Sequence, residues 1–387
     1  MTIKILHTAD NHLDPRLPMY RHKIMERRRD FWNSFKYVLE YAKERKPDLL
    51  LISGDLYDRV NPRNPPRTHL LKFFRFLFKQ GVHVFLIGGH HDTPRSVEEG
   101  ASPLDELAAS GYVYFLRGID EMSVEHVKIG DVDVCVSGVT YNFALGRDDD
   151  PLERTKPRAE GDVNILMLHY PIEGFTRTYM LSEPLVRLSN IGEEINYVAA
   201  GHLHQHQERM YGSTFIAYPG STERKSFLEE KDDVKGFLWV ELGEEGVEDK
   251  KFIEVPARLM KTLTYTLSSE STSPSSDIVS YALQHKNEEL ILRLKISGRV
   301  PLDVLTKYRR DEIIRRLLDH FFFVVIDDES LVYRIEKFEP MKWQSPLEAY
   351  EKYVDKLIQE EKDSQRRKIL EIAKEMVIEK LVEIGAW

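Results

Sequence analysis

The sequence predicts an α/β fold in which two mixed β-sheets form a sandwich flanked by helices. Seven apolar runs of strand length recur over residues 1–245, and a helix-length stretch separates the first two. That stretch places Phe31, Phe35 and Ala42 on one face, which is typical of a helix covering a parallel sheet. No long helix separates the later runs, so we expect those strands to be antiparallel additions. The predicted strands are Ile3–Leu6, Leu49–Ile52, Val82–Ile87, Val132–Val136, Ile165–Leu168, Tyr197–Ala200 and Phe237–Val240.

The character of the sequence changes near residue 256, where a small α/β unit is expected to begin. Its predicted strands, Leu263–Leu267, Leu290–Ile296 and Phe322–Ile326, alternate with helices. Farther on, Ser345-Pro346-Leu347-Glu348 matches a capping box, and two amphipathic stretches follow it. We therefore expect three domains, at residues 1–255, 256–340 and 341–387. The second would be a small capping domain and the third a C-terminal helical segment.

Composition limits the environment and the partners of the protein. The chain has 387 residues, one cysteine and a formal net charge of −9. A single cysteine excludes an intrachain disulfide, and the apolar runs are too short to span a membrane. We expect a reducing, aqueous compartment, the cytoplasm. The net negative charge does not exclude nucleic acid as a partner, because residues 16–29 and 59–79 are locally basic.

Five polar clusters each follow a predicted strand. The carboxyl ends of strands share one edge of an α/β sheet, where ligands bind, so these segments would bring carboxylates and imidazoles together. Any one cluster alone is more often a simple turn, but the five together indicate a site. They are His7-Thr8-Ala9-Asp10-Asn11-His12, Gly54-Asp55-Leu56-Tyr57-Asp58, Gly89-His90-His91-Asp92, His169 and Gly201-His202-Leu203-His204.

These residue types predict a particular chemistry. Aspartate and histidine ligands without cysteine suit borderline divalent metals such as Mn²⁺, Fe²⁺ or Zn²⁺. A carboxylate that bridges two such ions holds them about 3.5–4 Å apart, and the pair activates water and neutralises charge on phosphate oxygens. The ligand set is therefore suited to metal-assisted hydrolysis.

In this order, the five clusters resemble the motifs of the calcineurin-like metallophosphoesterases, and among them the SbcD/Mre-type nucleases of DNA double-strand-break repair. The resemblance covers about residues 1–245. It implies a metallophosphoesterase sandwich that cuts DNA phosphodiester bonds with two divalent metal ions, for which we expect Mn²⁺. By the resemblance, one ion would bind Asp10, His12, Asp55 and His204, and the other Asp55, His90, His169 and His202. His91 would be catalytic, protonating the leaving oxygen, and Asp58 would stabilise its charged form.

Position 90 departs from the family pattern, which has asparagine where this chain has His90. Histidine can ligate a metal through nitrogen, but it is bulkier, lacks the amide donor and titrates near neutral pH. His90 is therefore either a tolerated alternative ligand or a substitution that weakens the second metal site.

The two basic segments lie next to the predicted metal motifs. Arg16, Arg27 and Arg28 follow the first motif, and Arg59 and Arg63 follow the second. We expect these arginines to contact DNA phosphates flanking the cleaved bond. The alternative is a solvated basic face without a partner.

Two further segments suggest protein partners. The helix expected over residues 66–80 is apolar on more than one face, so it is either deeply buried or part of a homodimer contact, which the resemblance favours. The C-terminal helices have two possible roles. Either they fold onto their own domain or, as the resemblance implies, they bind the coiled-coil base of an SMC-like (Rad/SbcC-type) ATPase.

Two other functions remain open from the sequence. The same metals would serve a phosphatase or phosphodiesterase acting on a small molecule or a phosphoprotein. A second metal site impaired by His90 would leave a DNA-binding scaffold without activity. The basic segments and the appended α/β unit favour a DNA nuclease over both.

Overall fold

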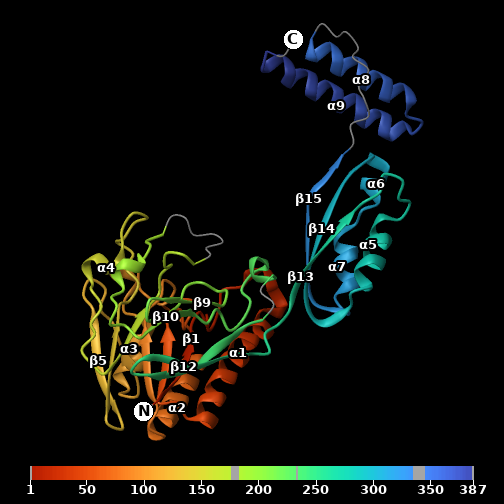
Figure 1. The fold of residues 1–387 in the computed structure, drawn as a ribbon. Coiled ribbons are helices and arrows are strands. Elements are labelled where there is room, and N and C mark those ends of the chain that lie inside the picture. The colour runs from red at the N-terminus through yellow and green to blue at the C-terminus, as the bar shows by residue number, and fades with distance from the viewer. Residues whose placement is uncertain (1, 176–182, 232–233, 334–344, 386–387) are drawn as a thin grey trace.

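The computed structural model describes residues 2–175, 183–231, 234–333 and 345–385, and two six-stranded sheets dominate its larger part (Figure 1). The first sheet contains β1 (Ile3–Thr8), β2 (Leu49–Ser53), β3 (His83–Ile87), β4 (Tyr114–Phe115), β11 (Gly236–Gly243) and β12 (Gly246–Glu254), in the order β12-β11-β1-β2-β3-β4. The second contains β5 (Ser123–Ile129), β6 (Val132–Gly138), β7 (Val163–Leu168), β8 (Tyr197–Ala200), β9 (Gln207–Tyr211) and β10 (Thr214–Tyr218), in the order β5-β6-β7-β8-β10-β9. The predicted sandwich of two mixed sheets is confirmed, and each of the seven strands predicted over residues 1–245 lies in one of them.

Strand direction follows the prediction in the first sheet only. There β1 to β4 run parallel, connected through the helices α1 (Ile24–Arg45), α2 (Asn64–Lys79) and α3 (Pro103–Ala109), and β11 is antiparallel to β1. In the second sheet, β6, β7 and β8 are parallel, so the expected antiparallel pairing is wrong there. In the described part of their connections, the helices are the short α4 (Pro151–Arg154) and η3 (Leu188–Asn190). A parallel return needs enough chain to cross the sheet, and these connections are long enough without a long helix among the described residues.

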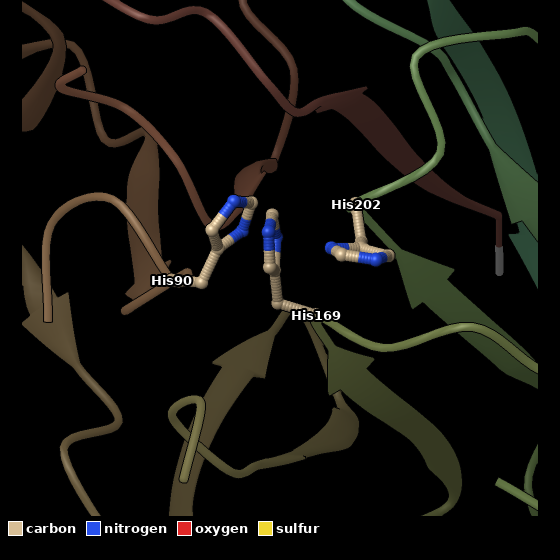
Figure 2. Close-up of side chains that lie close together, drawn as sticks. All are labelled: His90, His169 and His202. Carbon is tan, nitrogen blue, oxygen red and sulfur yellow. The ribbon is translucent and has the colours of Figure 1, made fainter. Parts of the chain in front are cut away.

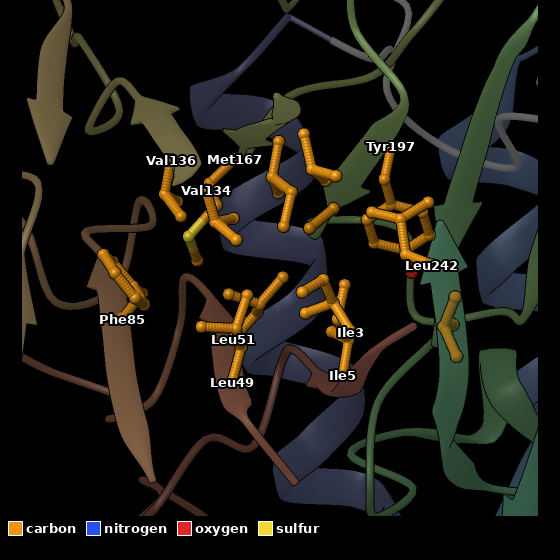
Figure 3. Packing of buried hydrophobic residues seen from close by; sticks show 14 of the residues in the cluster. Ile3, Ile5, Leu49, Leu51, Phe85, Val134, Val136, Met167, Tyr197 and Leu242 are labelled. Carbon is orange, nitrogen blue, oxygen red and sulfur yellow. The ribbon is translucent and has the colours of Figure 1, made fainter. Parts of the chain in front are cut away.

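The main core lies between the two sheets, and alternate strand residues form it. Ile5, Leu49 and Leu51 of the first sheet pack there against Val134 and Met167 of the second (Figure 3). The intervening residues of the same strands point outward and are also buried, beneath α1 and α2 in the first sheet. Because both faces of these strands are covered, their sequences are almost continuously apolar.

Helix α2 buries one face and leaves another exposed. Leu70, Phe74 and Leu77 are fully buried against the first sheet, while Phe76 and Phe78 are 39% and 49% exposed. The helix is therefore not deeply buried on all sides, and its second apolar face lies at the surface.

A three-stranded parallel sheet follows the sandwich. It contains β13 (Met260–Thr266), β14 (Asn287–Val300) and β15 (Phe321–Tyr333), with α5 (Pro274–Leu283), α6 (Leu302–Lys307) and α7 (Arg310–Leu317) packed against it. Ile291 and Phe323 of this sheet also contact Tyr20 and Phe31, which belong to η1 (Pro18–Lys23) and α1. The boundary expected near residue 255 falls between β12 and β13, and the one expected near residue 340 lies outside the described residues.

The last two helices, α8 (Pro346–Glu360) and α9 (Ser364–Glu383), pack against each other (Figure 1). Tyr350 donates to the carbonyl of Ala373 at 3.3 Å, and Ser345 accepts from the backbone N–H of Glu348, so this part of the predicted cap is present. In the described ranges, no helix combines the length and the apolar character that crossing a membrane would require.

Arg27 belongs to the interior, so the prediction that it contacts DNA is wrong. Its guanidinium has no exposed surface and donates to Glu223 and to Asp30, each at 3.1 Å. Glu223 also accepts from Ser34 on the same helix and from the backbone N–H of Arg258. Residues 27, 31 and 34 recur at helical spacing on the buried face of α1, so this position faces inward although its neighbours in the basic run do not.

Replacing Arg27 with alanine should destabilise the protein by about 3–5 kcal/mol, because it leaves the Glu223 carboxylate buried without a cation. Urea unfolding measures this change in the free energy of unfolding. Arg29→Ala is the matched control on the same helix, since Arg29 is exposed, and it should change stability by no more than about 0.5 kcal/mol. Equal effects of the two substitutions would contradict the assignment.

Candidate metal centre

The five predicted clusters meet at one edge of the sandwich. Asp10, Asp55 and His90 lie in the loops that follow β1, β2 and β3 of the first sheet, and His169 and His202 follow β7 and β8 of the second. Figure 2 shows His90, His169 and His202 converging from separate segments. The site therefore lies where the carboxyl edges of the two sheets come together.

The carboxylate of Asp55 lies at the centre of this arrangement. Its Oδ2 atom is 3.2 Å from Nδ1 of His90, 3.4 Å from Nε2 of His169 and 3.8 Å from Nε2 of His12. Within the described ranges, Oδ2 of Asp55, Nδ1 of His90 and Nε2 of His169 are buried without a hydrogen-bond partner. Buried polar atoms that face one another without hydrogen bonds fit a cation between them.

Among the described residues, several overlapping groups of side chains could hold a metal ion, and two of these groups share no residue with each other. One group is Asp10, His12 and His204, in which the Nε2 atoms of the two histidines are 3.0 Å apart. The other is His90, His169 and His202. The ligand atoms within each group lie within 4.8 Å of one another. These groups correspond to the two sets that the family resemblance implies, and the assignment of each residue to an ion stays a prediction.

Three of the histidines contact an oxygen atom through Nδ1, the ring nitrogen farther from the centre, and this contact orients the ring. Nδ1 of His169 donates to the backbone carbonyl of Ser53 at 2.8 Å. Nδ1 of His204 lies 3.1 Å from Oε1 of Glu229, and Nδ1 of His12 lies 3.3 Å from Oδ1 of Asp58. Such a partner fixes the tautomer, so each ring turns Nε2 toward the centre and can offer a lone pair to a metal.

The loops that carry the ligands have a strained backbone. Asp10, His12, Asp55 and His202 adopt left-handed conformations with φ of 51°, 46°, 50° and 94°. Each such residue costs on the order of 1–3 kcal/mol, and this strain is typical of positioned functional groups. The neighbouring glycines allow the loops to approach: a Cβ atom on Gly201 would overlap the carbonyl of Ser53.

The electrostatics of the site suit metal ligation. Burial lowers the pKa of His12 to about 3 and holds the pKa of His90 well below its usual value, so both rings are neutral, as ligation requires. Burial alone would also lower the pKa of His169, but the Asp55 carboxylate raises it to about 10. Without a metal, His169 keeps a proton beside Asp55, and a cation that binds there displaces this proton.

His91 and Asp58 lie beside the centre, with contacts that differ from the expected pairing. Nδ1 of His91 donates to the backbone carbonyl of Asp58 at 3.0 Å, and Nε2 faces Nζ of Lys225 at 3.2 Å. Oδ1 of Asp58 is 3.7 Å from that Nδ1 but 3.3 Å from His12 and 2.6 Å from Nζ of Lys225. Asp58 is therefore shared among several groups, and its role in stabilising a charged His91 stays a prediction.

Three residues at the site, Lys225, Glu229 and Glu183, lie outside the predicted clusters. Oε2 of Glu183 lies 2.5 Å from Nε2 of His202, and Oε1 of Glu229 contacts Nδ1 of His204. Lys225 and Glu229 belong to the segment after β10, so the rule that polar residues after a strand form the site would have found them. That strand was not among those predicted.

Four of the five arginines predicted to contact DNA lie near the metal centre. Arg59, Arg63 and Arg28 surround the buried carboxylate of Asp14, at 2.5, 2.7 and 3.6 Å. Arg16 has an exposed side chain, and its backbone N–H donates to Oδ2 of Asp58. The arginines therefore form a positive rim beside the site, from which Arg27 is excluded.

A model of the calcineurin-like phosphoesterase family matches residues 3–206, more than half of the chain. The protein therefore belongs to the calcineurin-like phosphoesterases, as the motifs indicated. Its distant relatives over most of the chain are proteins named DNA double-strand break repair protein Mre11, which supports the SbcD/Mre type.

Two of these relatives show the extent of the similarity. The protein from Methanocaldococcus jannaschii is 29% identical over 61% of this chain, which spans 62% of that protein's length. The protein from Sulfolobus acidocaldarius is 25% identical over 82% of this chain and 81% of that protein. Among solved structures, TT1561 of Thermus thermophilus aligns with a TM-score of 0.37 and 12% identity over 65% of this chain and 99% of that one.

Substitution of His90 should show whether it is a metal ligand. His90→Ala should weaken binding of the second Mn²⁺ ion by at least about tenfold, while His90→Asn keeps an oxygen ligand and should retain that ion. Isothermal titration calorimetry with MnCl₂ measures the affinity of both variants for Mn²⁺. His126→Ala, at an exposed histidine on β5, is the control. Unchanged Mn²⁺ binding by His90→Ala would show that His90 is not a ligand, and higher activity in His90→Asn would favour a weakened site.

Proposed function

We propose that this protein is a metal-dependent DNA nuclease that hydrolyses phosphodiester bonds and acts in double-strand-break repair. The observation that carries the proposal is the convergence of aspartates and histidines from five loops on the buried carboxylate of Asp55. The repair proteins named among its relatives support DNA as the substrate. We expect two divalent ions, and Mn²⁺ suits the ligand set.

The side chains around the centre have separate tasks in this mechanism. Divalent ions, when bound, activate water and neutralise charge on the phosphate. His91, held through Nδ1 by the carbonyl of Asp58, takes up a second proton on Nε2 and gives it to the leaving oxygen. The carboxylate of Asp58 keeps His12 turned with Nε2 toward the centre.

The arginines around Asp14 are suited to bind phosphates flanking the cleaved bond. Three guanidinium groups share one carboxylate, so the cluster keeps a net positive charge. Asp14 also accepts from the backbone N–H of Arg63, which fixes the loop that carries that arginine. The guanidinium groups are therefore positioned before DNA arrives, which lowers the entropy cost of binding.

The double substitution Arg59→Ala with Arg63→Ala should make DNA binding less dependent on salt. Each lost phosphate contact reduces the slope of log K against log salt concentration by about 0.9. Fluorescence anisotropy with duplex DNA over a series of KCl concentrations measures the slope. Lys128→Ala is the control, because Lys128 is exposed on β5 beside Asp133 at the amino-terminal part of β6, opposite the site. An unchanged slope in the double variant would reject the contacts.

Incubation with a panel of substrates separates the nuclease from its two rivals. The Mn²⁺-loaded protein should cleave labelled duplex, hairpin or single-stranded DNA and should also hydrolyse bis-p-nitrophenyl phosphate. Activity on p-nitrophenyl phosphate alone would indicate a phosphomonoesterase and reject the nuclease. Binding of Mn²⁺ and DNA without any hydrolysis would indicate a scaffold.

Two apolar surfaces are the proposed sites for protein partners. The exposed face of α2, with Phe76 and Phe78, would form a homodimer, and a monomeric mass in sedimentation at micromolar concentration would contradict it.

On α9, Ile369, Ile372 and Met376 are more than half exposed and would bind the coiled coil of an SMC-like ATPase. Co-purification that survives Ile372→Glu would reject that site.

We also propose that residues 1–255, 256–340 and 341–387 act as three domains. The separate core of the three-stranded sheet supports the second. Limited proteolysis should cut first near the two boundaries, and early cleavage inside the second domain would contradict this division.

A further inference from the structure

We propose that Lys225 is a catalytic residue, which binds the scissile phosphate of the diester beside His91. The inference rests on the proposed phosphodiesterase function and adds a group that the metal motifs do not contain. Nζ of Lys225 lies 3.2 Å from Nε2 of His91 and 2.6 Å from Oδ1 of Asp58. It is also 3.5 Å from Nδ1 of His12. Lys225 lies beyond residues 3–206, which the family model matches.

The backbone at Lys225 is anchored by the carboxylate that orients a predicted metal ligand. Oε1 of Glu229 accepts from the backbone N–H of Lys225 at 3.0 Å and contacts Nδ1 of His204 at 3.1 Å. Oε2 of Glu229 accepts from Ser221 and pairs with Lys235 at 2.7 Å. The segment before Lys225 is also fixed, because Glu223 is buried against Arg27. The lysine therefore extends toward His91 from a rigid base.

The ammonium group occupies a position that favours a cation. His12, Asp58 and His91 form one of the groups whose atoms could hold a metal ion, and Nζ of Lys225 lies within 3.5 Å of all three. Lys225 thus adds a fixed positive charge on the side of the centre where the leaving oxygen would lie.

The contacts of Lys225 leave it able to bind substrate. An ammonium group has three donors; one is directed to Nε2 of His91, the group forms an ion pair with Asp58, and the side chain is 23% exposed. A phosphate oxygen accepts a charge-assisted hydrogen bond more strongly than a neutral imidazole does. When a diester binds, the ammonium keeps its pair with Asp58 and donates to a non-bridging phosphate oxygen. Nε2 of His91, which no longer accepts from Lys225, then takes up a proton from solvent and gives it to the leaving oxygen.

The test uses the full chain loaded with Mn²⁺ and compares Lys225→Ala and Lys225→Gln with the natural protein. For hydrolysis of bis-p-nitrophenyl phosphate, kcat should fall about 100-fold, as it does when one donor to a transition-state oxygen is removed. The inhibition constant of inorganic phosphate should rise about tenfold, because a charged hydrogen bond to the anion is lost. Lys225→Arg keeps the positive charge, so it should recover part of the lost kcat and part of the lost affinity for inorganic phosphate.

Two controls separate binding of phosphate from a structural role. Mn²⁺ content and the melting temperature should be unchanged in the Lys225 variants, and Lys231→Ala, at an exposed lysine of the same segment, should behave as the natural protein does. Loss of Mn²⁺ in step with activity would overturn the inference, as would an unchanged kcat and inhibition constant. Failure of the natural protein to hydrolyse any ester would refute the proposed function instead. Calorimetric binding of inorganic phosphate to the Mn²⁺-loaded proteins would still measure the contribution of Lys225.

Discussion

Asp55 places a carboxylate with no exposed surface within 3.8 Å of the ring nitrogens of His12, His90 and His169. A buried charge among buried nitrogens is stable only when protons or cations balance it, and the surrounding loops are arranged to bring those nitrogens close. Left-handed residues and the glycines before the ligands permit this approach. Two cores, one between the sheets and one beneath α1 and α2, hold the strand ends in register, so packing far from the site fixes ligand positions within it.

The buried polar contacts extend this constraint from the metal centre to the rest of the molecule. Glu229 links His204 to Lys225, and Glu223, two residues before Lys225, is held by Arg27 of α1. Arg258, which precedes the three-stranded sheet, pairs with Asp30 of the same helix. A single connected set of ion pairs thus joins α1, the segment after β10 and the start of the third sheet. Substitutions in this set should affect stability and the geometry of the site together.

The sequence predicted seven strands of the sandwich and the convergence of the clusters because both follow from local rules. Apolar runs with covered faces are recognisable, and the carboxyl ends of such strands share an edge. It did not predict that β6, β7 and β8 are parallel, because irregular chain can make the crossover that a helix usually makes. Nor did it predict the burial of Arg27, whose charge resembles that of its exposed neighbours. Lys225 was missed because β10, the strand before it, was not predicted, and Glu183 was missed because its proximity to the site depends on tertiary structure.

We propose that Asp55 holds two cations between the two groups of ligands. Crystals grown with Mn²⁺ and measured for anomalous scattering test it most directly. The account predicts two peaks about 3.5–4 Å apart, both within bonding distance of the Asp55 carboxylate, one beside His12 and His204 and the other beside His169 and His202. A single peak, or peaks that do not share Asp55, would contradict it.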